Sequence, residues 1–267
     1  MNELSLFTGI GGGILGSILN GWRTVCAVEK DPYCREVLLR RQRDGVLPMF
    51  PIWDDAKTFD GKPWFGAVDI ITAGFPCQPF SVAGKRKGES DERNMWPDTI
   101  RIIREVRPRF ALLENVPGLL ATRYFGRILG DISESGYDAE WDVISAADVG
   151  APHWRKRLWV LLSDADQSRG RFQQKSGTKF EGQAVLEHDG EKKFMADANG
   201  SGFEEQRRAE PASQKQSASQ CASWWASEPS FCRMANGVSF RVDRLRGLGN
   251  AQVPAVVKRA WEILMGE

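Results

Sequence analysis

The chain has 267 residues, of which 42% are hydrophobic, and this suits a soluble globular protein with one α/β domain and a small additional module. Its 36 basic and 35 acidic side chains nearly cancel, so any nucleic-acid-binding surface must be local. No apolar run is long enough to span a bilayer, and the N-terminus lacks the basic segment and apolar core of a secretion signal. We therefore expect neither a membrane span nor export.

Cysteine and histidine usage argues against cross-links and metals. The five cysteines are irregularly spaced without a C-x-x-C pair, which disfavours a disulfide framework or a zinc site. His153 and His188 are the two histidines of the sequence, which weakens a metal hypothesis further. We predict free thiols in a reducing, cytoplasmic compartment and no bound metal.

The N-terminal segment has the order of a nucleotide-binding crossover. Residues 4–7 predict a strand, residues 8–13 a glycine-rich turn, and residues 14–19 an apolar helix. Glycines let the main chain pass close to a ligand, with the helix amides facing it. Such a turn also serves plain tight packing, so by itself it leaves both interpretations open.

A second strand, residues 24–28, ends in Glu29, at the distance that one βαβ unit requires. An acid at this place can accept hydrogen bonds from both hydroxyls of a ribose, and the alternative is a solvated strand end. Asp31 and Pro32 then predict the N-cap and first turn of a helix that continues through Arg41.

Cys77 is predicted to lie on a stiff loop. Residues 68–73 form an apolar run typical of a buried strand, and Pro76 and Pro79 prevent strand or helix from continuing across the cysteine. Ligands bind at the carboxyl edge of open α/β sheets, where this loop would stand. The alternative is a small buried hydrophobe in a turn. The polar, basic segment 82–90 is predicted to close over a substrate, with an idle loop as the alternative.

Another carboxylate, Glu114, stands at the end of the predicted strand 110–113. If the two strands are neighbours, Glu114 and Cys77 would present an acid and a nucleophile to one cleft. Arg155 and Arg157 precede a strand over residues 158–162, and at strand period they point to the same side, where they could hold phosphate or carboxylate.

The composition changes after Ser163. From there to about Phe240 the chain is rich in Gln, Ser, Lys, Glu and Gly with few periodic apolar runs, which on composition alone is compatible with partial disorder. The motif Gly249–Pro254 and an apolar-periodic helix over residues 255–264 indicate a return to the first domain.

Together these segments resemble the DNA cytosine-5 methyltransferases of bacterial and phage type. The resemblance begins with the long loop Gly74–Ser81 around Cys77. The chain departs from the family pattern at His153, where glutamine is more usual, and at Arg241–Leu245, which replaces the usual motif before the final Gly-Asn. The remaining matches, in the order of the family, are Phe7–Gly12, Glu29, Asp55, Glu114–Val116, His153–Arg157 and Gly249–Pro254.

The resemblance implies an α/β fold of the S-adenosylmethionine-dependent methyltransferase (Rossmann-like) type, with a mostly parallel, doubly wound sheet. It implies a catalytic methyltransferase domain over residues 1–162 and a small, irregular target recognition domain over residues 163–240. Residues 241–267 would be a C-terminal segment that returns to the catalytic domain.

The resemblance also assigns a site for S-adenosylmethionine. Glu29 would bind the ribose and Asp55 the adenine ring, with Asp54 as a rival for the second role. The residues assigned to this cofactor are Phe7, Gly9, Ile10, Gly11, Gly12, Glu29, Asp55, Pro76, Asn250 and Ala251.

The implied reaction is transfer of a methyl group to C5 of a cytosine in a specific duplex DNA sequence. Cys77 would attack C6 as a thiolate, and Glu114, with a pKa raised by a dry pocket, would hold and protonate N3. Arg157, with Arg155, would position the flipped base or its phosphates.

The expected partner is duplex DNA, in the cytoplasm of a bacterial cell or a phage-infected host. A monomer is the default expectation, and a paired restriction endonuclease stays open. Three alternatives are an RNA cytosine-5 methyltransferase, a catalytically weak DNA-binding relic of the same fold, and a nicotinamide-dependent oxidoreductase. The last would leave Cys77 and Glu114 without roles.

Overall fold

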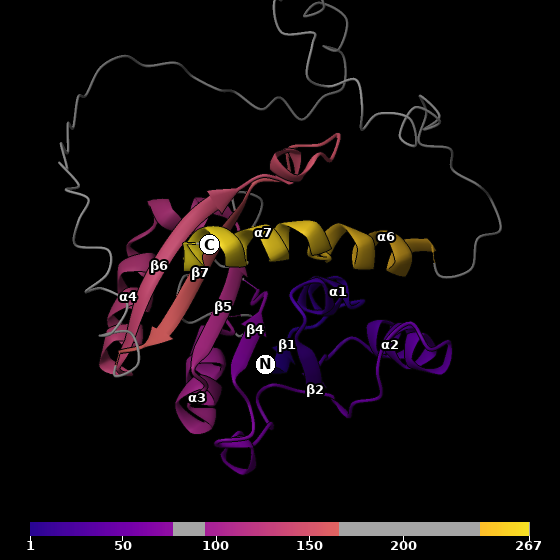
Figure 1. Ribbon diagram of the computed structural model, residues 1–267, viewed down its shortest axis with the longest axis horizontal. Helices are drawn as coiled ribbons and strands as arrows, with labels where there is room; N and C mark the ends of the chain where they lie inside the picture. The colour runs from indigo at the N-terminus through magenta and orange to yellow at the C-terminus, as the bar shows by residue number, and fades with distance from the viewer. Residues whose placement is uncertain (77–93, 166–240, 267) are drawn as a thin grey trace, which may run out of the picture. The chain divides into compact units, whose positions relative to one another are not determined.

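A seven-stranded sheet forms the centre of the computed structural model, which describes residues 1–76, 94–165 and 241–266 (Figure 1). The strand order is β3-β2-β1-β4-β5-β7-β6. Neighbours from β3 to β5 pair in parallel, and β7 is antiparallel to both β5 and β6. This confirms the mostly parallel α/β sheet. The strands are β1 Asn2–Leu6, β2 Arg23–Val28, β3 Ile52–Trp53, β4 Ile70–Ala73, β5 Phe110–Asn115, β6 Tyr137–Ile144 and β7 Arg157–Asp164.

Helices cover both faces of the sheet, as a doubly wound fold requires. One face packs against α3 and α4, and the other against α1, α2 and α7. The described helices are α1 Gly12–Leu19, α2 Pro32–Arg43, α3 Trp96–Val106, α4 Arg123–Glu134, α6 Arg241–Asn250 and α7 Pro254–Met265, with 3-10 turns η1 Lys62–Trp64, η4 Pro117–Ala121 and η5 Ala146–Val149.

Local chemistry sets several helix starts. The Asp31 carboxylate caps α2 by accepting a hydrogen bond of 3.1 Å from the main-chain N–H of Cys34, and Pro32 occupies the first turn. Pro254 likewise begins α7, where its missing N–H costs nothing. Prolines and a short acid therefore fix the points at which the chain turns into these helices.

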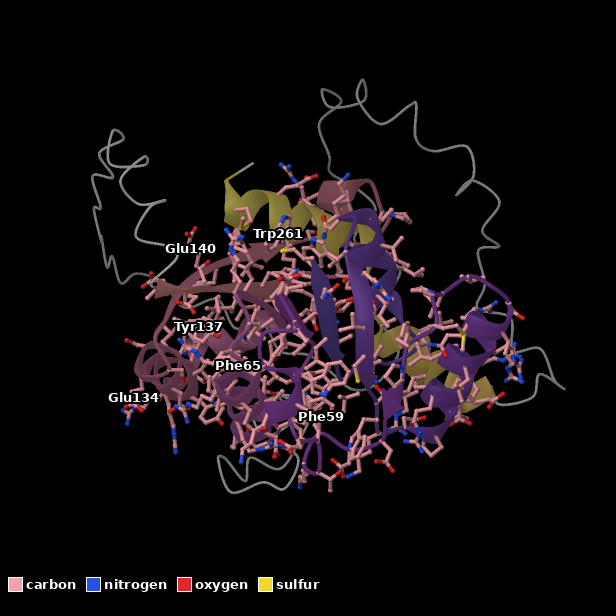
Figure 2. All side chains as sticks on the ribbon, turned by 60° about the horizontal axis from the view of Figure 1, so that its bottom comes forward. Phe59, Phe65, Glu134, Tyr137, Glu140 and Trp261 are labelled. Carbon is pink, nitrogen blue, oxygen red and sulfur yellow. The ribbon has the colours of Figure 1, made fainter. Side chains whose placement is uncertain are left out.

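The C-terminal helix α7 packs against both the sheet and α1. Trp261, labelled in Figure 2, makes edge-to-face contacts with Trp22 and Phe110 at ring-centroid distances of 4.9 and 5.3 Å. Gly16 of α1 lies so close to α7 that an added Cβ would stand 2.4 Å from Cβ of Val257. The first and last helices of the described chain thus share one apolar layer.

The predicted domain boundaries stay predictions, because β7 ends at Asp164 and the structure describes nothing between residues 165 and 241. Among the described residues, no helix has the length and apolar character needed to cross a membrane. Within the same ranges no cluster of three or more metal-ligating side chains occurs, and Cys26 and Cys34 are buried free thiols.

Candidate active site

A cavity of about 850 Å³ opens at the carboxyl edge of the sheet. The strand order reverses beside β1, because the chain runs outward to β2 and β3 and then returns to β4 on the other side. Crossovers diverge at such a switch point and leave a crevice between the loops. The cavity is lined by residues that follow β1, β2, β3, β4 and β5, and by residues of α6 and the segment after it.

In the turn between β1 and α1, some glycines line the cavity and others allow close packing. Phe7, Gly9 and Gly11 have φ values of 53°, 59° and 93°, in the left-handed region that favours glycine. Phe7 and Gly9 line the cavity. Ile10, Gly11 and Gly12, predicted with them to bind the cofactor, are not among the lining residues.

Gly11 and Gly12 instead face other parts of the protein. A Cβ on Gly11 would lie 3.0 Å from Cδ2 of Leu38 in α2. A Cβ on Gly12 would lie 2.3 Å from the main-chain oxygen of Gln252. Tight packing, the alternative interpretation of a glycine turn, therefore accounts for part of this motif.

Glu29, at the end of β2, is held by the main chain of two loops. Its Oε2 accepts a hydrogen bond of 2.6 Å from the N–H of Gly9, and its Oε1 accepts one of 2.7 Å from the N–H of Asp31. The residue is only 8% exposed, and burial raises the pKa of its carboxyl. Each oxygen keeps a further lone pair for a donor in the cavity, as a ribose hydroxyl would require.

Asp55 lines the cavity beyond β3, whereas its rival Asp54 is exposed and is not among the lining residues. Asp55 accepts a hydrogen bond of 3.0 Å from the main-chain N–H of Lys57 and pairs with Nζ of Lys30 at 2.9 Å. The hydrogen bond from Lys57 is the main cause that lowers the pKa of Asp55. The carboxylate is therefore ionised and faces the cavity.

Glu114 is the last residue but one of β5, and it lines the same cavity. Its Oε1 lies 2.9 Å from Nε of Arg157, the first residue of β7. Because β7 is antiparallel, it begins beside the carboxyl end of β5, which brings the guanidinium to the cavity. Burial raises the pKa of Glu114, while Arg157 and Arg155 oppose that rise.

Arg155 also acts on Glu114, but its position does not follow from the strand periodicity that the sequence analysis used. It lies before β7 with a φ of 28°, so strand periodicity does not relate its direction to that of Arg157. Its Nη2 donates hydrogen bonds of 2.8 and 2.7 Å to the carbonyl oxygens of Gly249 and Ala251. Arg155 thus fastens the segment that contains Asn250 and Ala251, two lining residues predicted to bind the cofactor.

Asn115 ties the loop after β4 to the end of β5. Its Nδ2 donates a hydrogen bond of 3.2 Å to the carbonyl oxygen of Phe75, and its Oδ1 accepts one of 2.8 Å from Val116. Pro76, the next residue of the loop, lines the cavity. Cys77 and the predicted loop 82–90 lie outside the described residues. The described chain therefore leads to the cavity wall immediately before the predicted nucleophile.

Some residues of the site were not predicted from the sequence. Asp243, Arg246 and Gly247 of α6 line the cavity, and Nη1 of Arg246 lies 3.6 Å from Oδ2 of Asp31. No local pattern in residues 241–247 points to a ligand. Gln252 also lines the cavity, and its place inside the closing motif was the one available signal.

Comparison with known proteins decides the family. The sequence model of the family described as C-5 cytosine-specific DNA methylase matches residues 1–234. The chain belongs to this family. That match covers most of the chain, and it agrees with the fold.

Individual relatives of this chain include bacterial Type II methyltransferases. The Type II methyltransferase M.NgoMIV of Neisseria gonorrhoeae is 35% identical over 61% of this chain and 52% of its own length. M.BsuFI of Bacillus subtilis is 33% identical over 70% of this chain and 46% of its own length. The chain thus spans about half the length of these curated relatives.

Solved structures of the same fold include a protein encoded within an E. coli prophage. It is 27% identical to this chain, with a TM-score of 0.52, and the match covers 63% of this chain and 48% of that protein. The Dnmt2 methyltransferase of S. pombe is 22% identical with a TM-score of 0.51, covering 71% and 62% of the two chains. The second likeness supports the fold alone.

Proposed function

We propose that this protein transfers a methyl group from S-adenosylmethionine to C5 of a cytosine in duplex DNA. The observation that carries the proposal is the single cavity that joins Glu29 and Asp55 to the Glu114–Arg157 pair. Glu29 and Glu114 end strands separated by three inter-strand intervals, roughly 14 Å at about 4.8 Å each. That span accommodates a nucleoside cofactor beside a second planar ring.

The chain offers suitable groups at the cofactor end. Glu29 would bind the ribose hydroxyls and Asp55 the exocyclic amine of the adenine, with Phe7, Gly9, Pro76, Asn250 and Ala251 lining the remaining wall. When bound, S-adenosylmethionine supplies an electrophilic methyl group on its sulfonium. The main-chain hydrogen bonds to Glu29 and Asp55 fix both carboxylates before any ligand arrives.

At the other end, Cys77 and Glu114 would act on a cytosine flipped out of the duplex. The Cys77 thiolate forms a bond to C6 while Glu114 donates its proton to N3, so the electron pair pushed into the ring makes C5 nucleophilic. After C5 has gained its methyl group, loss of the C5 proton, expulsion of the thiolate and return of the N3 proton to Glu114 restore the aromatic ring. Arg157 holds the Glu114 carboxyl in place throughout.

The domain organisation and the cellular setting are part of the same proposal. Residues 163–240 would form the target recognition domain that selects the DNA sequence, and residues 1–162 with 241–267 the catalytic domain. The relatives named as Type II methyltransferases favour a restriction–modification setting in a bacterial cytoplasm, with the protein acting as a monomer.

Trapping on 5-fluorocytosine tests the reaction. Duplex DNA with this base in many sequence contexts is incubated with the protein and S-adenosylmethionine, and covalent adducts are separated on a denaturing gel. Because fluorine blocks the final loss of the C5 substituent, the wild type should accumulate a thioether adduct. Cys77→Ala should give none, and Glu114→Gln should form it about 10²- to 10⁴-fold more slowly.

The same experiment separates the alternatives. An adduct with RNA but not with DNA would establish an RNA methyltransferase. Binding of S-adenosylmethionine and DNA without an adduct in the wild type would overturn the proposed reaction and leave a DNA-binding relic.

A further inference from the structure

Gln252 is surrounded by three glycines, two at the start of α1 and one in the loop after β4. A Cβ on Gly13 would lie 2.5 Å from Oε1 of Gln252, and one on Gly74 would lie 3.1 Å from its Nε2. A Cβ on Gly12 would lie 2.3 Å from the main-chain oxygen of the same residue. Any larger side chain at these positions would displace Gln252, so the glycines leave room for a specific protein group.

The amide of Gln252 faces the carboxyl of Glu114. The Cβ position over Gly74 is 3.1 Å from Nε2 of Gln252 and also 3.1 Å from Oε2 of Glu114, so the two groups meet above this glycine. A side-chain hydrogen bond from Gln252 is one of the causes that oppose the burial-driven rise of the Glu114 pKa. An ionised carboxylate only accepts hydrogen bonds, so the amide nitrogen is the atom that must face it. Arg157 pairs with the other oxygen, Oε1, at 2.9 Å.

The main chain of Gln252 is fixed on both sides. Arg155 donates hydrogen bonds to the carbonyl oxygens of Gly249 and Ala251, just before it. Pro254 begins α7 just after it, and that helix packs against Gly16. A side chain on such a rigid segment can hold a partner in a defined orientation.

We propose that Gln252 is a positioning residue, which holds the Glu114 carboxyl between itself and Arg157 in the orientation needed to exchange a proton with the base. The role of Gln252 in proton exchange rests on the proposed function, whereas its contact with Glu114 does not. Each carboxyl oxygen then has its own donor, from β7 on one side and from the segment before α7 on the other. As a donor, Gln252 favours the ionised form and opposes the effect of burial.

Carbon-13 NMR of the carboxyl of Glu114 tests the inference in the cofactor-free protein. The resonance is assigned by its absence from Glu114→Gln, and its titration is followed in the wild type and in Gln252→Met, which keeps the length but removes the donor. We expect the pKa of Glu114 to rise in Gln252→Met. Gly13→Ala should raise it as well, because its methyl group would push the Gln252 amide aside without touching Glu114.

Gln42 provides a matched control. It is a buried glutamine of α2 whose Nε2 donates to the carbonyl oxygens of Pro48 and Phe50 at 3.2 and 2.9 Å. Gln42→Met should lower stability and leave the Glu114 titration unchanged. An unchanged titration in both Gln252→Met and Gly13→Ala would overturn the inference and reduce Gln252 to a packing residue.

Methylation assays on the same variants keep the two proposals distinguishable. If Glu114 acts as a proton donor, the alkaline limb of the pH–rate profile of Gln252→Met should shift to higher pH, by the same amount as the NMR titration. A shifted titration in a protein whose wild type does not methylate DNA would contradict the proposed function while the role of Gln252 toward Glu114 stands.

Discussion

Three buried carboxyl groups of this protein are stabilised by three kinds of partner. Glu29 is held by main-chain N–H groups, and Glu114 by Arg157 and Gln252. Glu3 of β1 is fully buried, and its carboxyl accepts hydrogen bonds from neutral hydroxyl groups. Each of the three carboxyls has a pKa raised mainly by burial. In each case the partners oppose the effect of burial on the pKa.

Glu3 gives a prediction about stability and pH. Ser17, Thr24 and Thr72 each donate a hydrogen bond of 2.6 Å to its carboxyl, which joins α1, β2 and β4 to β1. Because its folded-state pKa is raised, Glu3 contributes stability at low pH that is lost as the pH rises through that pKa. In Glu3→Gln, the amide can donate to the Thr24 hydroxyl and this loss should disappear.

Urea unfolding of the wild type and Glu3→Gln from about pH 5 to about pH 8 measures the difference. The wild type should lose stability relative to the variant as the pH increases. A difference that stays constant over this range would show that Glu3 does not titrate there.

Asp54 and Asp55 give a paired test of cofactor binding. Asp55→Asn should weaken binding of S-adenosylmethionine roughly tenfold, because a charged acceptor in the cavity is lost. Asp54→Asn, the exposed neighbour, should bind like the wild type. Titration calorimetry gives both dissociation constants, and equal effects of the two substitutions would remove Asp55 from the adenine site.

At the scale of elements, the contact between α1 and α7 explains a glycine inside a helix. Gly16 lies in the middle of α1, where alanine would usually stabilise the helix by about 1 kcal/mol. Here the added methyl group would lie 2.4 Å from Cβ of Val257 and 2.9 Å from the carbonyl oxygen of Pro254. Close helix packing therefore outweighs helix propensity at this position.

Gly16→Ala should destabilise the protein by about 1–3 kcal/mol through overpacking. Gly126→Ala is the control, because Gly126 lies inside α4 with nothing within 4 Å of an added Cβ. That variant should be more stable than the wild type by about 0.5–1 kcal/mol. Thermal unfolding should show a lower melting temperature for Gly16→Ala and a higher one for Gly126→Ala. A stabilised Gly16→Ala would refute the packing argument.

For the whole molecule, sequence patterns predicted the sheet and the strand-end acids better than the contacts between distant segments. Glu29 follows β2 and Glu114 lies at the carboxyl end of β5, so the buried apolar runs before them place both acids at one sheet edge. The strand periodicity used to relate Arg155 to Arg157 does not apply, because β7 begins two residues after Arg155. The approach of Gln252 to Gly13 and Gly74 could not be predicted, since packing between remote segments leaves no local periodic signal.

Cofactor binding should stabilise the whole domain, because the cavity is built from segments between Ser5 and Gln252. At 100 times its dissociation constant, S-adenosylmethionine should add about 2.7 kcal/mol to the stability of the folded state. Cys77→Ala should keep this gain, since the nucleophile is not assigned to cofactor binding. Thermal unfolding with and without the ligand measures both, and no shift in either protein would contradict the assigned cofactor.

The seating of Gln252 among the glycines of α1 also sets the order of events during synthesis. Translation produces α1 long before residues 250–257, so the contacts of Gly13 with Gln252 and of Gly16 with Val257 can form only after the intervening chain has been made. A nascent chain stopped before residue 250 has the acids of the strand ends but neither the amide that meets Glu114 nor the helix that covers Gly16. The wall of the cavity is therefore complete only after residues 250–252, which line it, have been made.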